Sequence, residues 1–485
     1  MEYAFTPLTE IAQKVVTARA AFAAGSTRPQ AWRRATLERL RDLVQEREEE
    51  LLGALAADFG KPRFEAWTTE LGYVINEINH TLAHLSTWMQ PDRVRTPLAF
   101  KPGSSHVVAE PVGVACVIAP WNYPVQLLLA PMIAAIAAGN AVVGKPSELA
   151  PHASSALASL IEAIGDPAVC VVQGGVAETS ELLAQRFDHI LYTGNSRVAR
   201  IVMRAAAENL TPVTLELGGK SPAVVSRHAN VKVAARRIAW GKFINAGQTC
   251  IAPDYVLVER SVHDELVAAI GNSIDEFYGG DPQASADYTR IVNEPHFHRL
   301  EKLLDSSKVA IGGTTDVDTR YIAPTVLTGI SIDDPVMGEE VFGPILPIIA
   351  VDSLTEAIEF VQQRAHEGDK PLALYSFSES DDENDQVIAG TSSGGVCVNG
   401  TLLHVANPNL PFGGVGESGM GSYHGKFGFD TFSHRRGVHT RSTRMDPAMM
   451  YPPYTDKKQK LVRKGMLLPD PRDVGAKLRG ALHRD

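Results

Sequence analysis

The sequence predicts an α/β protein of more than one domain, the first of which contains a mostly parallel, doubly wound sheet. Its 485 residues suggest two to four compact units, at about 100–200 residues per domain. Hydrophobic residues make up 44% and charged residues 21% of the chain, which are ordinary globular proportions. From residue 112, short β-branched runs alternate with longer helical patterns, as in parallel strands joined by right-handed crossovers. A disordered chain, a collagen-like repeat and a bundle of membrane spans are therefore excluded.

The first 90 residues are expected to form helices. Residues 8–25 are rich in alanine, and residues 30–59 carry apolar side chains such as Leu37, Leu40 and Leu51 among charged ones. This spacing is typical of amphipathic helices that pack on a core. We interpret the acidic run 46–50 as a solvated helix face rather than a partner-binding motif.

The next segment predicts the doubly wound sheet. Five strands are expected at residues 114–118, 141–144, 169–172, 189–193 and 213–217, with helices between them at 125–138, 151–164, 178–185 and 196–208. Sheets of this kind bind ligands at the carboxyl ends of their strands. We therefore look for the functional residues at those ends.

A second alternation predicts a second α/β domain. Strands are expected at 223–226, 255–259, 345–351, 372–377 and 395–398, and long helices at 230–245 and 261–278. The acidic stretch 379–385 is interpreted as the exposed start of another helix.

Charge and cysteine content restrict the location and partners of the protein. The net charge of −10 argues against general nucleic-acid binding, although residues 441–485 form a basic tail of net +6. The start has no secretory layout, and the most apolar stretch, 111–144, is interrupted by Pro and Asn, so we expect no stable membrane insertion. Four widely spaced cysteines suit neither a disulfide framework nor a zinc ribbon. A cytoplasmic protein without a bound metal is expected.

Two apparent nucleotide motifs are rejected. Residues 139–145 read G-x-x-x-x-G-K, but Pro146 follows where a phosphate loop has Ser or Thr. Gly414, Gly416 and Gly419 read G-x-G-x-x-G, but they do not open a helix after a strand. We interpret these three as turn glycines.

One cysteine has the context of a nucleophile. Cys116, Cys170 and Cys397 lie in β-branched runs, where a thiol behaves as a small hydrophobe. Cys250 instead lies in the Gly- and Pro-bounded segment 245–253, after a long helix. Such a loop can present a reactive group, and an inert loop thiol is an equally good interpretation of the residues alone.

Three further positions have chemistry that suits Cys250. Glu216 ends a strand among apolar neighbours, which raises the pKa of a carboxyl toward that of a general base. Asn122, at the junction after the first strand, could donate to an oxyanion or cap a helix. Thr193 ends a strand before Gly194 and Asn195, and the helix start that follows could bind a pyrophosphate.

Seven ordered motifs resemble those of the aldehyde dehydrogenase superfamily over about residues 8–440. They are PWNYP (120–124), KPSE (145–148), YTGN (192–195), LELGGK (215–220), GQTC (247–250), EEVFGP (339–344) and PFGG (411–414). The segments GQTCIAPDY (247–255), YHGKF (423–427) and TFSHRR (431–436) resemble the class 3 branch, which acts on aromatic and medium- or long-chain aldehydes.

The resemblance implies NAD- or NADP-dependent oxidation of an aldehyde to an acid. Cys250 would attack the carbonyl and carry a thiohemiacetal and then a thioester. The Asn122 amide and the Cys250 backbone N–H would hold the oxyanion, and Glu216 would activate the hydrolytic water. Tyr73 and Tyr123 would wall the substrate channel, with ordinary core packing as the alternative interpretation of both.

The same resemblance implies the cofactor contacts. Lys145 and Glu148 would bind the adenosine ribose, and Thr193, Gly194 and Asn195 would border the pyrophosphate. Glu340 and Phe342 would position the nicotinamide end.

The resemblance also implies a domain plan and a homodimer. Residues 1–92 and 112–216 would form the Rossmann-like cofactor domain, and 217–420 the catalytic domain. A bridging hairpin at 93–111 would join 421–440 for oligomerisation, ahead of the basic tail. Two alternatives stay open: a coenzyme A-acylating relative and a non-catalytic binding homologue of the fold.

Overall fold

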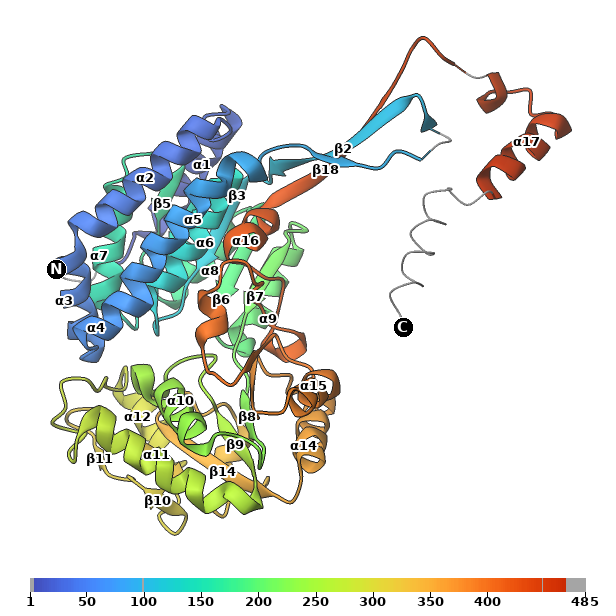
Figure 1. Ribbon diagram of the computed structural model, residues 1–485. Coiled ribbons are helices and arrows are strands. Elements are labelled where there is room, and N and C mark those ends of the chain that lie inside the picture. The colour runs from blue at the N-terminus through green and yellow to red at the C-terminus, as the bar shows by residue number, and fades with distance from the viewer. Residues whose placement is uncertain (1–3, 98–99, 447, 468–485) are drawn as a thin grey trace. The chain divides into compact units, whose positions relative to one another are not determined.

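The structure is a computed structural model that describes residues 4–97, 100–446 and 448–467. It divides into two compact units (Figure 1). The first comprises Met1–Ser86 and Pro111–Ser433, and the second Thr87–Glu110 and His434–Asp485.

The N-terminal region is helical, as predicted. Its elements are α1 (Leu8–Ala23), α2 (Gln30–Glu46), α3 (Glu48–Phe59), α4 (Arg63–Ala66), the π-helical turn η1 (Trp67–Leu71) and α5 (Gly72–Trp88). The stretch 30–59, predicted to be helical, contains two helices. Arg47, at φ −108° and ψ 23°, separates α2 from α3.

The first sheet is the predicted doubly wound one. Its strand order is β17-β7-β6-β3-β4-β5, and every pair is parallel except β17 with β7. The strands are β3 (Val114–Ile118), β4 (Ala141–Lys145), β5 (Val169–Val171), β6 (His189–Thr193), β7 (Val213–Glu216) and β17 (Gly419–Met420), and the crossover helices are α6 (Pro124–Ala138), α7 (Pro151–Glu162), α8 (Val176–Ala184) and α9 (Ser196–Ala207). All the predicted elements are present, and β17 is an addition from late in the chain.

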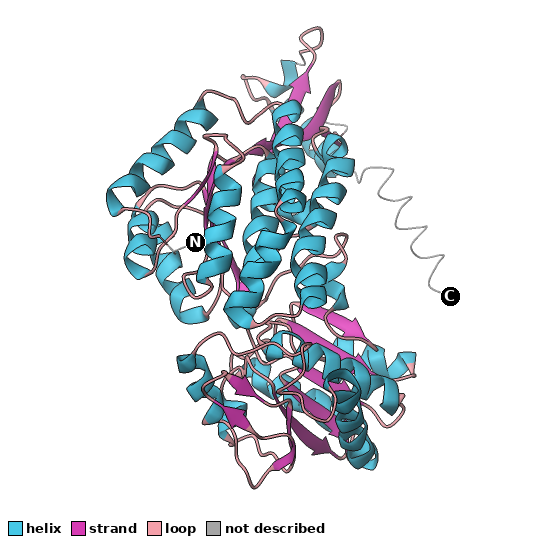
Figure 2. Cartoon of the chain, turned by 90° about the vertical axis from the view of Figure 1, so that its left-hand side faces the viewer, coloured by secondary structure: helices cyan, strands magenta, loops and turns pink. Residues whose placement is uncertain are grey.

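Successive side chains along each strand point to opposite faces of this sheet, so both faces have buried side chains and are covered by helices (Figure 2). Ile11 and Val15 of α1 pack with Cys116 and Val143 in one buried cluster that also includes residues of α8 and α9. On the opposite face, α6 is buried over its whole length and packs on β3 and β4. The carboxyl ends of the strands are thereby left for a site.

The second sheet has the order β10-β13-β14-β9-β8-β15-β16, parallel except for β10 with β13. Its strands are β8 (Pro222–Val225), β9 (Tyr255–Glu259), β10 (Val309–Ile311), β13 (Thr325–Leu327), β14 (Ile345–Val351), β15 (Ala373–Phe377) and β16 (Gly395–Val398). A separate pair is formed by β11 (Thr315–Asp316) and β12 (Tyr321–Ile322). The five strands predicted for this domain are confirmed, whereas β10 to β13 were too short to be predicted.

Helices and turns complete this unit. They are α10 (Val231–Phe243), η3 (Ile244–Gly247), η4 (Arg260–Val262), α11 (His263–Tyr278), α12 (Glu294–Glu301), α13 (Pro335–Gly338), α14 (Leu354–His366), α15 (Asp381–Gly390), η5 (Leu403–Ala406), η6 (Gly416–Ser418) and α16 (Gly425–Thr431). The helix expected at 230–245 ends at Phe243, because Asn245 and Ala246 leave helical geometry.

The second unit is a three-stranded sheet followed by the tail. Its strands are β1 (Asp92–Val94), β2 (Gly103–Pro111) and β18 (Ser433–Arg441), in the order β1-β2-β18. Arg436 pairs with Glu110 at 3.0 Å.

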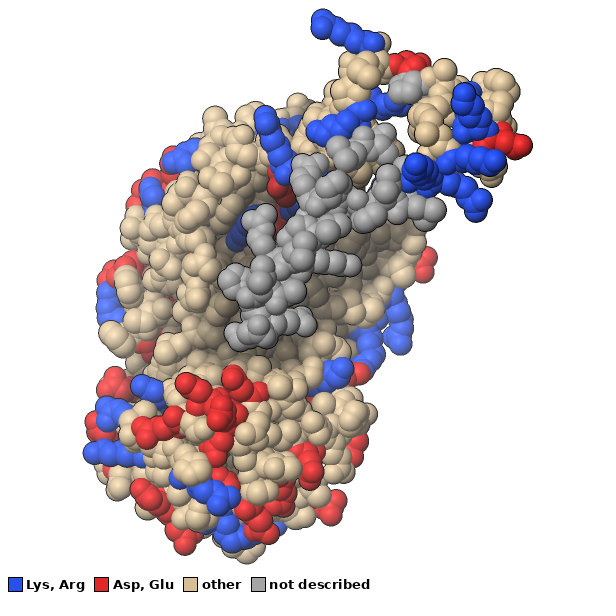
Figure 3. Space-filling model, turned by 45° about the vertical axis from the view of Figure 1, so that its right-hand side comes forward, with Lys and Arg blue, Asp and Glu red and all other residues tan. Residues whose placement is uncertain are grey.

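The tail continues from this sheet as η7 (Ala448–Met450) and α17 (Asp456–Leu467). Residues 441–467 include seven Lys or Arg and two Asp, and Figure 3 shows blue side chains gathered on this segment. The rest of the predicted basic tail, 468–485, lies outside the described residues. Within the described ranges, no helix has the length and apolarity needed to cross a bilayer.

Candidate active site

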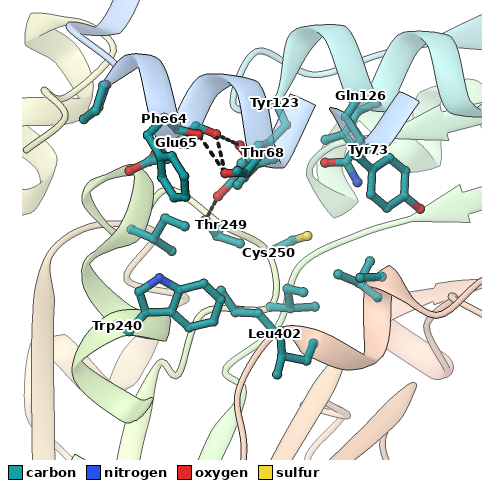
Figure 4. Close-up of a pocket in the computed structure, with 18 of the residues that line it drawn as sticks. Phe64, Glu65, Thr68, Tyr73, Tyr123, Gln126, Trp240, Thr249, Cys250 and Leu402 are labelled. Atoms are coloured by element: carbon teal, nitrogen blue, oxygen red, sulfur yellow. Dashed lines mark hydrogen bonds between the residues drawn. The ribbon is translucent and has the colours of Figure 1, made fainter. Parts of the chain in front are cut away.

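A left-handed turn places Cys250 at the wall of a cavity. After α10, Asn245, Ala246 and Gly247 have φ values of 52°, 50° and 71°. A Cβ on Gly247 would lie 2.2 Å from the carbonyl oxygen of Gly343, so this position requires glycine. Cys250 follows this turn three residues later and is partly exposed to the cavity (Figure 4).

Asn122 is tied to the loop that carries Cys250. Its side-chain Nδ2 donates to the carbonyl oxygen of Gln248 at 3.0 Å, and the residue is 2% exposed. It does not cap α6, whose first N–H groups, those of Val125 and Gln126, donate to the carboxylate of Glu70 at 2.9 and 3.1 Å. Of the two interpretations of Asn122, the helix cap is therefore wrong.

Glu216 carries a buried carboxyl group. It is the last residue of β7, lies opposite Thr193 of β6 and Gly419 of β17, and is 2% exposed. Among the described residues, neither side-chain oxygen has a hydrogen-bond partner. Burial therefore raises the pKa of Glu216 well above its usual value, since nothing nearby compensates the charged form.

Glu340 approaches the glycine pair that follows Glu216. A Cβ on Gly218 would lie 1.9 Å from Glu340 Oε2, so only glycine admits the carboxylate there. Burial, together with the charge of Asp254, raises the pKa of Glu340 to about 8. Nearby, Phe342 has a left-handed φ of 48° and packs edge-on to Trp121, with ring centroids 5.4 Å apart.

The surroundings of Cys250 keep its thiol protonated. Burial is the largest cause, and the negative charges of Glu340 and Glu216 add to it, so the pKa of Cys250 is raised above its usual value. A cation brought to the site would lower this pKa again.

A separate group of residues lies at the carboxyl ends of β4 and β6. Lys145, 4% exposed, pairs with Glu148 at 2.9 Å. Thr193 is buried, and its hydroxyl finds no partner in the part of the chain that the structure describes. Gly194 is followed by Asn195, whose side chain caps α9 by accepting from the backbone N–H of Val198 at 3.0 Å.

The cavity beside Cys250 has a volume of about 460 Å³ and mostly apolar walls. Tyr73 and Tyr123 line it, and the Tyr123 hydroxyl and Thr249 Oγ1 lie 2.7 Å apart (Figure 4). Other lining residues were not found from the sequence; they include Glu65, Thr68, Gln126, Leu127, Trp240, Phe277, Leu402, Val405, Phe412 and Tyr423.

Sequence reasoning also missed a short segment that supports the site. Lys61 and Glu70 form a fully buried ion pair at 2.8 Å, and Lys61 also donates to the backbone oxygen of Asn122 at 3.3 Å. The available signal was the break Gly60-Lys61-Pro62 at the end of α3, which interrupts an otherwise helical pattern.

Comparison with known proteins identifies the family. A family model described as "Aldehyde dehydrogenase family" matches residues 4–438. The chain belongs to the aldehyde dehydrogenase family. A relative from Rattus norvegicus named "Aldehyde dehydrogenase, dimeric NADP-preferring" is 48% identical over 92% of this chain and 98% of its own length. The "4,4'-diaponeurosporen-aldehyde dehydrogenase" of Staphylococcus aureus is 47% identical over 92% of this chain and 97% of its own.

A solved structure agrees with this assignment. The structure titled "Substrate bound state of Staphylococcus Aureus AldH" matches with a TM-score of 0.90 and 45% identity, over 93% of this chain and 98% of that one. Relatives named "Aldehyde dehydrogenase family 3 member A2" and "B2", at 47–48% identity, confirm the predicted class 3 resemblance. The predicted fold and the predicted reaction, oxidation of an aldehyde with NAD or NADP, are therefore confirmed for this aldehyde dehydrogenase.

Proposed function

We propose that this enzyme oxidises aromatic or medium- to long-chain aldehydes to acids through a thioester on Cys250. The observation that carries the proposal is the apolar cavity of about 460 Å³ with Cys250 in its wall. A cavity of this size and polarity suits a hydrophobic ligand, with the few polar groups fixing its reactive end. Cys250 then adds to the carbonyl carbon, and its proton leaves to a base.

The residues around Cys250 have complementary roles in the proposal. The Asn122 amide has two N–H groups, and one of them donates to Gln248 O. The other N–H and the backbone N–H of Cys250 both donate to the oxyanion. Burial makes the ionised carboxylate of Glu216 a stronger base than an exposed one, and its oxygens have no partner among the described residues; in the ionised form it accepts a proton from the water that hydrolyses the thioester.

The groups at the ends of β4 and β6 suit a dinucleotide. Lys145 and Glu148 would hold the adenosine ribose. Thr193, whose hydroxyl has no partner within the described ranges, would hold the pyrophosphate together with Gly194 and the start of α9. Asn195 would fix that start. Glu340 and Phe342 would orient the nicotinamide end. When bound, NAD or NADP accepts the hydride from the substrate carbon.

We also propose a homodimer located in the cytoplasm. The relative named as dimeric supports the first part, and the four cysteines without a disulfide among the described residues agree with a reducing compartment. Light scattering on the purified protein, and fractionation of cells that express it, test these two statements.

The reaction itself is tested by kcat/KM for benzaldehyde and for straight-chain aldehydes of increasing length, with NAD and NADP in parallel. Products are measured with and without coenzyme A. We expect free acid in both cases and higher kcat/KM for the apolar substrates. Product formation that requires coenzyme A would support the acylating alternative, and the absence of NAD(P)H with every aldehyde would support the non-catalytic one.

A further inference from the structure

The turn before Cys250 has a conformation that needs external support. Asn245 and Ala246 are non-glycine residues with left-handed φ angles, and both are buried. Such residues keep this conformation only where the surrounding structure holds it, because the Cβ crowds the backbone. The position of Cys250 therefore depends on whatever fixes this turn.

Glu65 fixes the first residue of the turn. The backbone N–H of Asn245 lies beyond the end of α10 and donates to Glu65 Oε1 at 2.9 Å. The Asn245 side chain donates to the backbone oxygens of Asn122 and Gln248 at 2.9 and 3.1 Å. Of the three oxygens that accept hydrogen bonds from Asn245, the Glu65 carboxylate is the only side-chain one. It comes from 180 positions earlier in the chain.

The segment that carries Glu65 is itself anchored to the site. Glu65 lies on α4, just before the π-helical turn η1, a geometry often found at functional positions. On either side of it, the Lys61–Glu70 ion pair binds the backbone of Asn122 and the start of α6. The positive charge of Lys61 also favours the ionised form of Glu65, although burial raises the pKa of Glu65 to about 7.

We propose that Glu65 is a positioning residue, whose carboxylate holds Asn245 in the left-handed turn and thereby presents Cys250 to the carbonyl carbon. This inference rests on the proposed role of Cys250 as the nucleophile. Figure 4 shows Glu65 in the cavity wall, on the segment above Thr249 and Cys250. Its influence on the reaction passes through the loop rather than through the substrate.

The test compares Glu65→Ala and Glu65→Gln by two measurements on the intact enzyme. The first is the rate at which iodoacetamide alkylates Cys250, followed by peptide mass mapping, and the second is kcat and KM for benzaldehyde. Loss of one buried hydrogen-bond partner should slow both alkylation and kcat by about tenfold in Glu65→Ala, with the aldehyde KM unchanged. Glu65→Gln keeps an acceptor oxygen and should stay within about threefold of the parent.

Two further variants separate positioning from a general structural role. Glu49→Ala removes an exposed carboxylate that pairs with Arg63 of the same α4, so it should leave both rates unchanged. Ala246→Gly lowers the strain of the turn at its second residue. The double variant Glu65→Ala, Ala246→Gly should therefore recover much of the alkylation rate that Glu65→Ala loses.

The proposal would be overturned by an unchanged alkylation rate in Glu65→Ala, or by no recovery of that rate in the double variant. A raised aldehyde KM with a normal alkylation rate would also overturn it, because Glu65 would then be a substrate contact. Failure of the proposed function is seen separately. If Cys250→Ala still oxidised aldehydes, the nucleophile assignment would be wrong, whereas the alkylation rates would still report on the loop.

Discussion

Gly218→Ala should impair the enzyme while leaving its fold intact. The new Cβ would lie 1.9 Å from Glu340 Oε2 and 2.7 Å from Oε1, and real Cβ contacts essentially never fall below 3.0 Å. The carboxylate must therefore move by about 1 Å. Because it ends a flexible side chain, the movement costs little stability, but a displacement of about 1 Å near a reacting centre can cost about 100-fold in rate.

The assay is kcat/KM for NAD and NADP at saturating aldehyde, together with the melting temperature. We expect a fall of about 10- to 100-fold for the cofactor and a melting temperature within about 2 °C of the parent. Gly53→Ala in α3 is the control, since no described atom lies within 4 Å of the added Cβ. Because alanine favours the helix over glycine, this variant should be more stable than the parent by roughly 0.5–1 kcal/mol. Parental kcat/KM in Gly218→Ala would refute the placement of Glu340 at the cofactor.

Cys250→Ala should abolish aldehyde oxidation in a cofactor-reduction assay and preserve cofactor binding; residual turnover would contradict covalent catalysis. Asn122→Ala should lower kcat by about 10²–10³, as for a lost oxyanion donor, and a change in KM alone would argue against that role. The folded protein keeps a proton on Glu216 that the unfolded chain releases above about pH 4.5, so stability falls as pH rises from that value toward the raised folded pKa. Glu216→Gln should remove this loss of stability, so its melting temperature should exceed that of the parent by more at pH 8 than at pH 5. Thioester hydrolysis should slow in the same variant. A melting-temperature difference that does not change with pH would contradict the assignment.

Periodicity predicted the strands and helices of the first sheet because each is a long, local pattern. The same reasoning failed where the cause is not local. The pattern of 30–59 does not show where α2 ends, because Arg47 follows it without Gly or Pro. The helix predicted at 230–245 runs too far, because Asn245 and Ala246 are left-handed although neither is glycine. Strands such as β10 and β13, of three residues each, are too short to show a period.

The residues of the candidate site likewise fall into those that the sequence could predict and those that only the folded chain brings together. Cys250, Glu216 and Asn122 stood out because each has unusual neighbours in the chain itself. Glu65 reads as one more surface glutamate of a helix, and only the folded chain brings it to Asn245. The cavity wall likewise combines side chains from about residue 62 to residue 423, a combination that no single segment contains.

The pairing of β17 with β7 has a consequence for how the enzyme is made. Gly419 lies opposite Glu216, and the backbone N–H of Leu217 donates to Ser418 O at 3.1 Å. Until residue 420 has left the ribosome, β7 remains an unprotected edge, open to pairing with a neighbouring nascent chain. A newly synthesised molecule thus surrounds Glu216, the proposed hydrolytic base, only after residue 420 has been made.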